Sequence, residues 1–126
     1  MPITYTIDPA RRWLITVASG WLSYAETAHH LELERDDGGL PLAELADATQ
    51  ALVNFSQPEV RKIVELLRQL GQHNALGPTA VVVANDVSYG VVRMIGILVE
   101  DVCAVLPFRA RAKAEEWLIE QPPLDG

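Results

Sequence analysis

Glu26, His30 and Glu34 are the residues of this sequence that come closest to a metal-binding pattern. They recur at every fourth position, so a helix places them on one face, where they can bind a divalent metal ion. All three come from one helix, however, no fourth ligand is indicated elsewhere, and the His-Glu-x-x-His pattern is absent. We therefore predict no metal site and interpret this stretch, including His29, as a solvated helix face with local charge pairs.

The rest of the sequence offers little to a catalytic mechanism. The single cysteine, Cys103, lies in an apolar segment, which is typical of a buried and unreactive thiol. No nucleophile-elbow motif occurs, and the glycines are scattered rather than gathered into a phosphate-binding loop. The acidic pairs Asp36-Asp37 and Glu115-Glu116 have the positions of loop and helix-surface charges. We therefore expect that the protein is not an enzyme and has no cofactor.

The composition predicts a single cytoplasmic domain. With 126 residues, of which 49% are hydrophobic, the chain can bury a sizeable core. Its formal net charge of −7 repels phosphate backbones, so we expect no nucleic-acid partner. Arg93 and Gly96 interrupt the best membrane-span candidate, and the N-terminal residues lack a secretion pattern, so we expect no membrane insertion. A lone cysteine fits a reducing compartment.

The chain is organised around the stretch from Thr79 to Val99. Residues 79–84 form an apolar run rich in β-branched side chains, as in a strand buried on both faces of a parallel sheet. Asn85 and Asp86 break this run and offer a helix cap, and residues 87–99 are predicted to form a helix. A buried strand that leads directly into a helix is half of a βαβ unit, so we expect the other elements to wrap this pair.

The remaining patterns predict three further stretches of strand: a hairpin of strands 3–7 and 13–17 that ends at Gly20, a strand at 42–48, and a short strand at 103–106. They also predict a helix from the Ser23–Glu26 capping box to 35 and a helix that begins at the Ser56–Glu59 capping box and stops at Gly71. A last helix is predicted at 110–119, with Ala110, Ala114 and Trp117 on its inward side. The alanines of 42–48 keep a helix open as an alternative. The predicted class is α/β: one domain over residues 1–120, with a four- to five-stranded mixed sheet and about four helices. The N-terminal hairpin is antiparallel, the remaining strands are mostly parallel, and residues 121–126 are predicted to be a disordered tail.

The helix predicted at 87–99 has two unlike faces. Its apolar arc is expected to pack on the sheet and consists of Val87, Val91, Val92, Met94, Ile95, Leu98 and Val99. The opposite face carries Tyr89, Gly90, Arg93, Gly96 and Glu100 and has few ordinary surface residues. Each helical glycine costs about 1 kcal/mol relative to alanine, but leaves a groove that a ligand or another backbone can approach. The alternative is a plain surface face that tolerates its glycines.

Several short motifs occur in a characteristic order, namely Glu44-Leu45-Ala46-Asp47, Ala80-Val81-Val82-Val83, Tyr89-Gly90-Val91-Val92-Arg93-Met94, and Phe108 followed by Ala114 and Trp117-Leu118. Together with the opening strands and Gly20, they make the chain similar to the STAS-like superfamily, most closely its SpoIIAA-like (STAS/Sec14-type) branch. The resemblance runs nearly end to end. It implies an α/β fold of four or five strands with four helices, and no assigned activity.

Better-known members of that superfamily are antagonists of anti-sigma factors, switched by phosphorylation of a serine in an Asp-Ser-Ser-Gly turn. The corresponding turn here is Phe55-Ser56-Gln57-Pro58, in which only Ser56 matches. Because Ser56 also begins a capping box, we interpret it as a helix cap rather than a switch.

The leading hypothesis is a non-enzymatic, cytoplasmic STAS-like module that binds a regulatory protein partner, or itself as a homodimer, through its exposed helices. The alternative is a module that holds a small apolar or anionic, lipid-like ligand, as the Sec14-type resemblance allows. The candidate binding residues are Tyr89, Arg93, Asp86 and Ser56. Tyr89 and Arg93 lie near a helix N-terminus after the central strand, where an anionic group is favoured. Arg93 can instead pair with Glu100 or with an acid of a neighbouring element.

Overall fold

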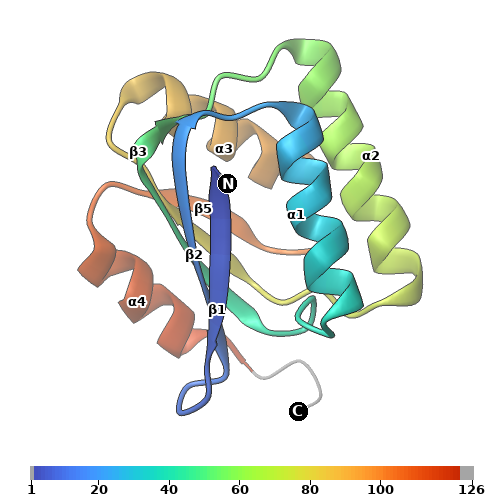
Figure 1. The fold of residues 1–126 in the computed structure, drawn as a ribbon, viewed down its shortest axis with the longest axis vertical. Coiled ribbons are helices and arrows are strands. Elements are labelled where there is room, and N and C mark those ends of the chain that lie inside the picture. The colour runs from blue at the N-terminus through green and yellow to red at the C-terminus, as the bar shows by residue number, and fades with distance from the viewer. Residues whose placement is uncertain (1, 123–126) are drawn as a thin grey trace.

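The computed structural model describes residues 2–122 as five strands and four helices around one sheet (Figure 1). The elements are β1 (Ile3–Asp8), β2 (Trp13–Trp21), α1 (Tyr24–Asp36), β3 (Ala43–Leu52), α2 (Gln57–His73), β4 (Thr79–Val82), α3 (Asp86–Leu98), β5 (Val105–Phe108) and α4 (Arg111–Glu120). The strands lie in sequence order; β1 and β2 are antiparallel, and the other neighbours are parallel. The predicted α/β class and mixed sheet are confirmed.

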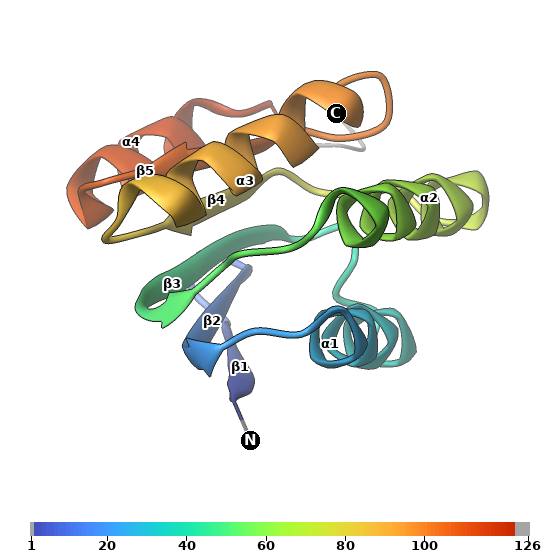
Figure 2. The same ribbon diagram turned by 90° about the horizontal axis from the view of Figure 1, so that it is seen from above.

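The helices divide unequally between the two faces of the sheet. The crossovers between parallel strands are right-handed as a rule, and with strands in sequence order they carry α1, α2 and α3 to the same face. Figure 2 shows these three helices following one another along that face. The last helix, α4, packs on the opposite face against β3, β4 and β5. We call the two sides the three-helix face and the α4 face.

Each face of the sheet has its own apolar core. The larger core lies on the three-helix face and includes Ala18, Leu22, Ala48, Ala51, Val53, Phe55, Val60, Ile63, Leu67, Val83, Val92, Ile95 and Val99. The smaller core lies under α4 and consists of Trp13, Leu45, Ala80, Val82, Ala114 and Leu118. On β4, Ala80 and Val82 belong to the smaller core and Val81 packs against the larger one, because successive side chains of a strand point to opposite faces.

Both capping boxes predicted from the sequence are present. Ser23 begins α1 and Ser56 begins α2, each with a glutamate three residues later whose carboxylate accepts from the capping backbone N–H. The predicted stop of α2 at Gly71 is wrong, because the helix continues to His73. A Cβ atom at Gly71 would lie 2.8 Å from a methyl group of Val102, so this glycine serves close packing rather than helix termination.

Several predicted boundaries shift in the structure. The strand predicted at 42–48 is confirmed over its helical alternative and extends to Leu52, and the last strand lies at Val105–Phe108 instead of 103–106. Gly20 does not end β2, which includes this residue at a φ of 73° and continues to Trp21. On α4, Ala114 and Leu118 are the buried residues, whereas Ala110, predicted to point inward, is exposed.

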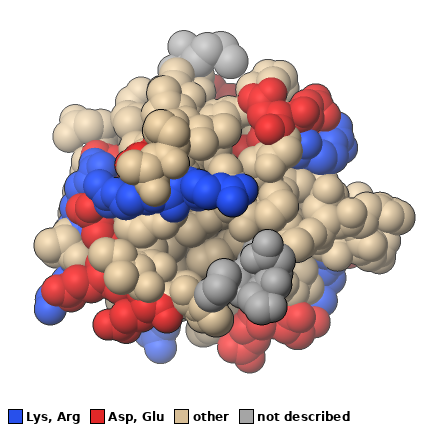
Figure 3. Space-filling model, turned by 90° about the horizontal axis from the view of Figure 1, so that it is seen from below, with Lys and Arg blue, Asp and Glu red and all other residues tan. Residues whose placement is uncertain are grey.

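No helix within residues 2–122 is long and apolar enough to cross a membrane. The tail predicted at 121–126 lies mostly outside the described residues. The underside of the molecule, drawn in Figure 3, carries acidic and basic side chains side by side rather than a field of one sign.

Candidate functional site

On the three-helix face, an apolar cavity of about 160 Å³ lies between the sheet and the helices α1, α2 and α3. Its walls come from all five strands and from α1, α2 and α3, with Phe55, Leu67 and Val92 among the apolar residues that line it. Ala18 and Ala48 line it from the strands. Because an alanine side chain ends at Cβ, these positions leave space that the helices above do not fill.

One end of this cavity is polar. Thr16 of β2, Glu44 of β3 and His30 of α1 line it, and Glu34 of α1 lies against His30. The Thr16 hydroxyl donates to Glu44 Oε2 over 2.6 Å, and His30 Nε2 lies 3.0 Å from the same oxygen. His30 Nε2 also lies 3.0 Å from Glu34 Oε1. We call His30, Glu34 and Glu44 the buried triad.

The fold positions the triad from two directions. His30 and Glu34 are one turn apart on α1, and the capping box at Ser23 sets where that helix begins. Glu44 comes from β3, with its side chain on the three-helix face of the sheet. The ring of Tyr5 on β1 packs edge-on against the His30 ring at 5.4 Å, and its hydroxyl donates to Asp37 just beyond α1.

The triad shifts the pKa of each of its members. Burial lowers the pKa of His30, but the hydrogen bonds and charges of Glu34 and Glu44 outweigh this and raise it to about 10. Burial, together with the charge of Glu44, raises the pKa of Glu34 to about 8. Burial also disfavours the charged form of Glu44, yet hydrogen bonds to His30, Glu34 and Thr16 hold its pKa below the ordinary value.

One atom of the triad lacks a hydrogen-bond partner. The single N–H at His30 Nε2 can point to only one carboxylate, and it is aligned with Glu44. Glu34 Oε1 is therefore a buried oxygen without a donor, on a residue that is only 2% exposed. Buried polar atoms of this kind are rare in native proteins and usually indicate a missing proton, ion or ligand.

The interpretation of this stretch as a solvated helix face is wrong. His30 is 8% exposed and lies with Glu34 on the inner side of α1. Glu26, the third residue of the predicted set, does not join them, because its carboxylate belongs to the capping box. Glu44 takes its place. The one signal in the sequence was a glutamate within a largely apolar strand segment.

The predicted binding residues lie elsewhere, and the structure brings only two of them together. Asp86 forms an ion pair with Arg109 over 2.5 Å, and the same guanidinium lies 4.8 Å from the centre of the Tyr89 ring. Arg93 is exposed, and the alternative ion pair with Glu100 is absent from the described part of the chain. Ser56 caps α2, and its hydroxyl accepts from the Glu59 backbone N–H over 3.3 Å.

The outer side of α3 exposes more apolar surface than the sequence indicated. Val92, Ile95 and Val99 are buried as predicted, but Val87, Met94 and Leu98 of the same predicted arc are exposed, as is Ile97. Gly90 is open, with no atom within 4 Å of an added Cβ. Gly96, by contrast, is not part of a free groove, because a Cβ there would lie 2.1 Å from the Val105 carbonyl oxygen. We call Val87, Gly90, Met94, Ile97 and Leu98 the α3 stripe.

Cys103 fits the predicted unreactive thiol. It is partly buried, and burial together with the charge of Asp101 raises its pKa to about 11. The thiol therefore stays protonated at neutral pH and is a poor nucleophile.

The comparison with known structures concerns the fold. The chain is similar to an uncharacterised protein of the DUF3478 family from Shewanella loihica PV-4, which is described as having a SpoIIAA-like fold. The two share 16% sequence identity at a TM-score of 0.60, over 92% of this chain and 93% of the other. No protein-family model matches the sequence, and no curated protein matches it either. This chain thus has the SpoIIAA-like fold that its motifs implied.

Proposed function

We propose that the protein is a non-catalytic binding module that acts through the α3 stripe, and that a second copy of the chain is what covers this stripe. The observation that carries the proposal is the exposure of four large apolar side chains on one side of one helix. Val87, Met94 and Leu98 recur at intervals of seven and four residues, the spacing by which one helix packs along another.

A second copy is a suitable occupant for two reasons. An apolar stripe is complementary to itself, so a two-fold axis buries both copies at once. The open Gly90 also lets a second backbone approach closely. The remainder of the chain, with a net charge of −7, favours separation of the copies, so the uncharged stripe must supply the attraction. Arg93, exposed on the same helix, is then a contact at the rim, beside Asp86 and Tyr89.

The experiment compares two exposed isoleucines on different helices. Ile97 lies in the stripe and is 56% exposed, whereas Ile119 on α4 is 71% exposed and lies outside it. Light scattering at micromolar concentration should give twice 13.9 kDa for the parent and for Ile119→Glu, and 13.9 kDa for Ile97→Glu. A parent of 13.9 kDa at these concentrations, or a dimer that survives Ile97→Glu, contradicts the proposal.

The internal cavity supports a second candidate function, the binding of a small apolar molecule. A cavity of about 150 Å³ with apolar walls is known to bind benzene, so the 160 Å³ here suits one aromatic ring or the apolar end of a larger ligand. The carboxylates at its polar end disfavour an anionic ligand at this place. An anion would have to bind outside, near Arg93.

This second candidate has its own test. Benzene and indole should each raise the melting temperature of the parent, because a ligand that binds only the folded state stabilises it. Ala48→Val fills part of the cavity and should abolish the rise, whereas Arg93→Ala should leave it unchanged. Equal rises in the parent and in Ala48→Val contradict binding in the cavity.

A further inference from the structure

The buried triad brings three metal-ligating atoms to one point, and nothing proposed above uses them. His30 Nε2, Glu34 Oε1 and Glu44 Oε2 come from two different elements of the fold. One carboxylate oxygen from each glutamate and one ring nitrogen all lie within 4.8 Å of one another. An imidazole with carboxylates is a ligand set that divalent transition metals accept.

The orphaned oxygen is independent evidence that this point is incomplete. Hydrogen bonds alone leave Glu34 Oε1 without a partner, because the one N–H of His30 Nε2 serves Glu44. A cation between the three atoms contacts all of them at once and removes the need for that N–H. The Thr16 hydroxyl already holds the Glu44 carboxylate from the other side, as outer partners of metal ligands do.

The spacing of the donor atoms also fits an ion. Both distances from His30 Nε2 to the carboxylate oxygens are 3.0 Å. Two ligands at right angles around a metal, each about 2.1 Å away, stand about 3.0 Å apart, whereas tetrahedral ligands stand about 3.4 Å apart. The two distances from His30 Nε2 thus match those between neighbouring ligands of an octahedral site.

We propose that His30, Glu34 and Glu44 form a binding site for one divalent transition-metal ion, such as Zn²⁺ or Mn²⁺. His30 binds as the neutral imidazole through Nε2, and each glutamate binds as a carboxylate. His30 and Glu44 line the cavity, so the positions that the triad leaves free on the ion face that space. A second hollow, between the start of β1 and α1, also reaches His30, beside Ile3 and Leu33, and offers a route for the ion.

The test uses two neighbouring histidines of the same helix. The parent, His30→Gln and His29→Gln are stripped with a chelator, dialysed against micromolar Zn²⁺ or Mn²⁺, and assayed by elemental analysis. His29 is exposed and lies outside the triad, so His29→Gln should bind one equivalent of metal, as the parent does. His30→Gln and Glu34→Gln should bind at least about tenfold more weakly, because each loses a ligand.

Two further measurements distinguish a loss of metal binding from a folding defect. Glutamine has nearly the same shape as glutamate, so metal-free Glu34→Gln should show the circular dichroism spectrum of the parent. Metal should raise the melting temperature of the parent and of His29→Gln, and not that of Glu34→Gln. Absence of bound metal in the parent, or equal binding by the parent, His30→Gln and Glu34→Gln, overturns the proposal. Neither outcome bears on the proposed dimer, which is tested separately by the oligomeric state of Ile97→Glu.

Discussion

The two faces of the sheet differ in how closely the helices pack on the strands. On the α4 face, Ala80 and Ala114 are completely buried, and Leu118 and Trp13 pack beside them. On the three-helix face, three helices share the task and leave a cavity of about 160 Å³ over alanines of β2 and β3. The same residue type therefore permits close packing on one side and leaves empty space on the other.

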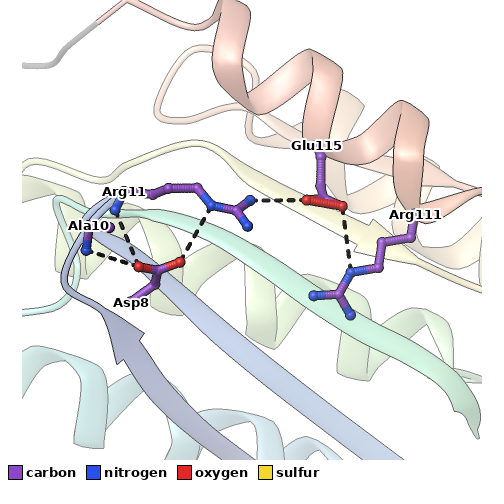
Figure 4. A network of polar contacts seen from close by, with 5 residues as sticks. All are labelled: Asp8, Ala10, Arg11, Arg111 and Glu115. Atoms are coloured by element: carbon purple, nitrogen blue, oxygen red, sulfur yellow. Dashed lines mark hydrogen bonds and ion pairs between the residues drawn. The ribbon is translucent and has the colours of Figure 1, made fainter.

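The charged residues of the two faces differ in how deeply they are buried. At α4 they form an ion-pair network near the surface, in which Arg11 links Asp8 to Glu115, and Arg111 approaches Glu115 from the helix (Figure 4). On the three-helix face, His30 and Glu44 are buried next to the cavity. The network ties the β1–β2 hairpin to the last helix, whereas the triad joins α1 to β3 inside the molecule.

Removing a carboxylate should give the largest difference between the two faces in the free energy of unfolding. Glu44→Ala removes one of the two carboxylates that lie 3.0 Å from His30 Nε2 and leaves the buried Thr16 hydroxyl without its acceptor; breaking a buried pair costs about 3–5 kcal/mol. Glu115→Ala removes partly exposed ion pairs and should cost at most about 1 kcal/mol. Urea unfolding with a chelator present measures both. Equal losses would mean that the triad is no more buried in solution than the surface network.

A smaller difference is expected from adding methyl groups to two strand alanines. Ala80 on the α4 face is 0% exposed and Ala48 beside the cavity is 3% exposed, so burial alone does not distinguish them. Ala80→Val overpacks a filled space and should cost about 1–3 kcal/mol. Ala48→Val fills empty space and should change stability by less than this, with a gain of up to about 1 kcal/mol. The comparison fails if Ala48→Val is as destabilising as Ala80→Val.

The smallest effect concerns Ser56, at the exposed start of a helix on the three-helix face. Ser56→Ala removes the cap and should cost about 1 kcal/mol, whereas Ser56→Asp, which can also cap, should cost much less. Thermal unfolding measures both variants. If Ser56→Asp keeps its stability but does not form the dimer proposed above, Ser56 regulates assembly and is more than a cap.

Local patterns in the sequence were enough to predict the class of fold. The capping boxes at Ser23 and Ser56 involve residues three apart, and the apolar face of α2 repeats with the period of a helix. The alternation of strands and helices after the hairpin implied a mostly parallel sheet. These features depend on neighbours in the chain, so the order of residues reveals them.

The roles of two glycines could be assigned only from the packed structure. Gly71 has the position of a helix stop, and Gly96 that of an open groove, but each is small because another segment touches it. Val102 contacts Gly71, and the Val105 carbonyl oxygen contacts Gly96. A pattern within one helix carries no information about a segment that packs against it from elsewhere in the chain.

The buried triad depends on the tertiary structure most of all. Spacing along α1 places His30 and Glu34 on one side of the helix, but nothing in that helix tells which side faces inward, because polar residues occupy both. Docking of α1 against the sheet decides this and brings Glu44 of β3 to the same point. Burial then raises the pKa of Glu34, and the two glutamates together raise that of His30. Helix periodicity is a property of adjacent turns, whereas this charge cluster is a property of how distant elements pack.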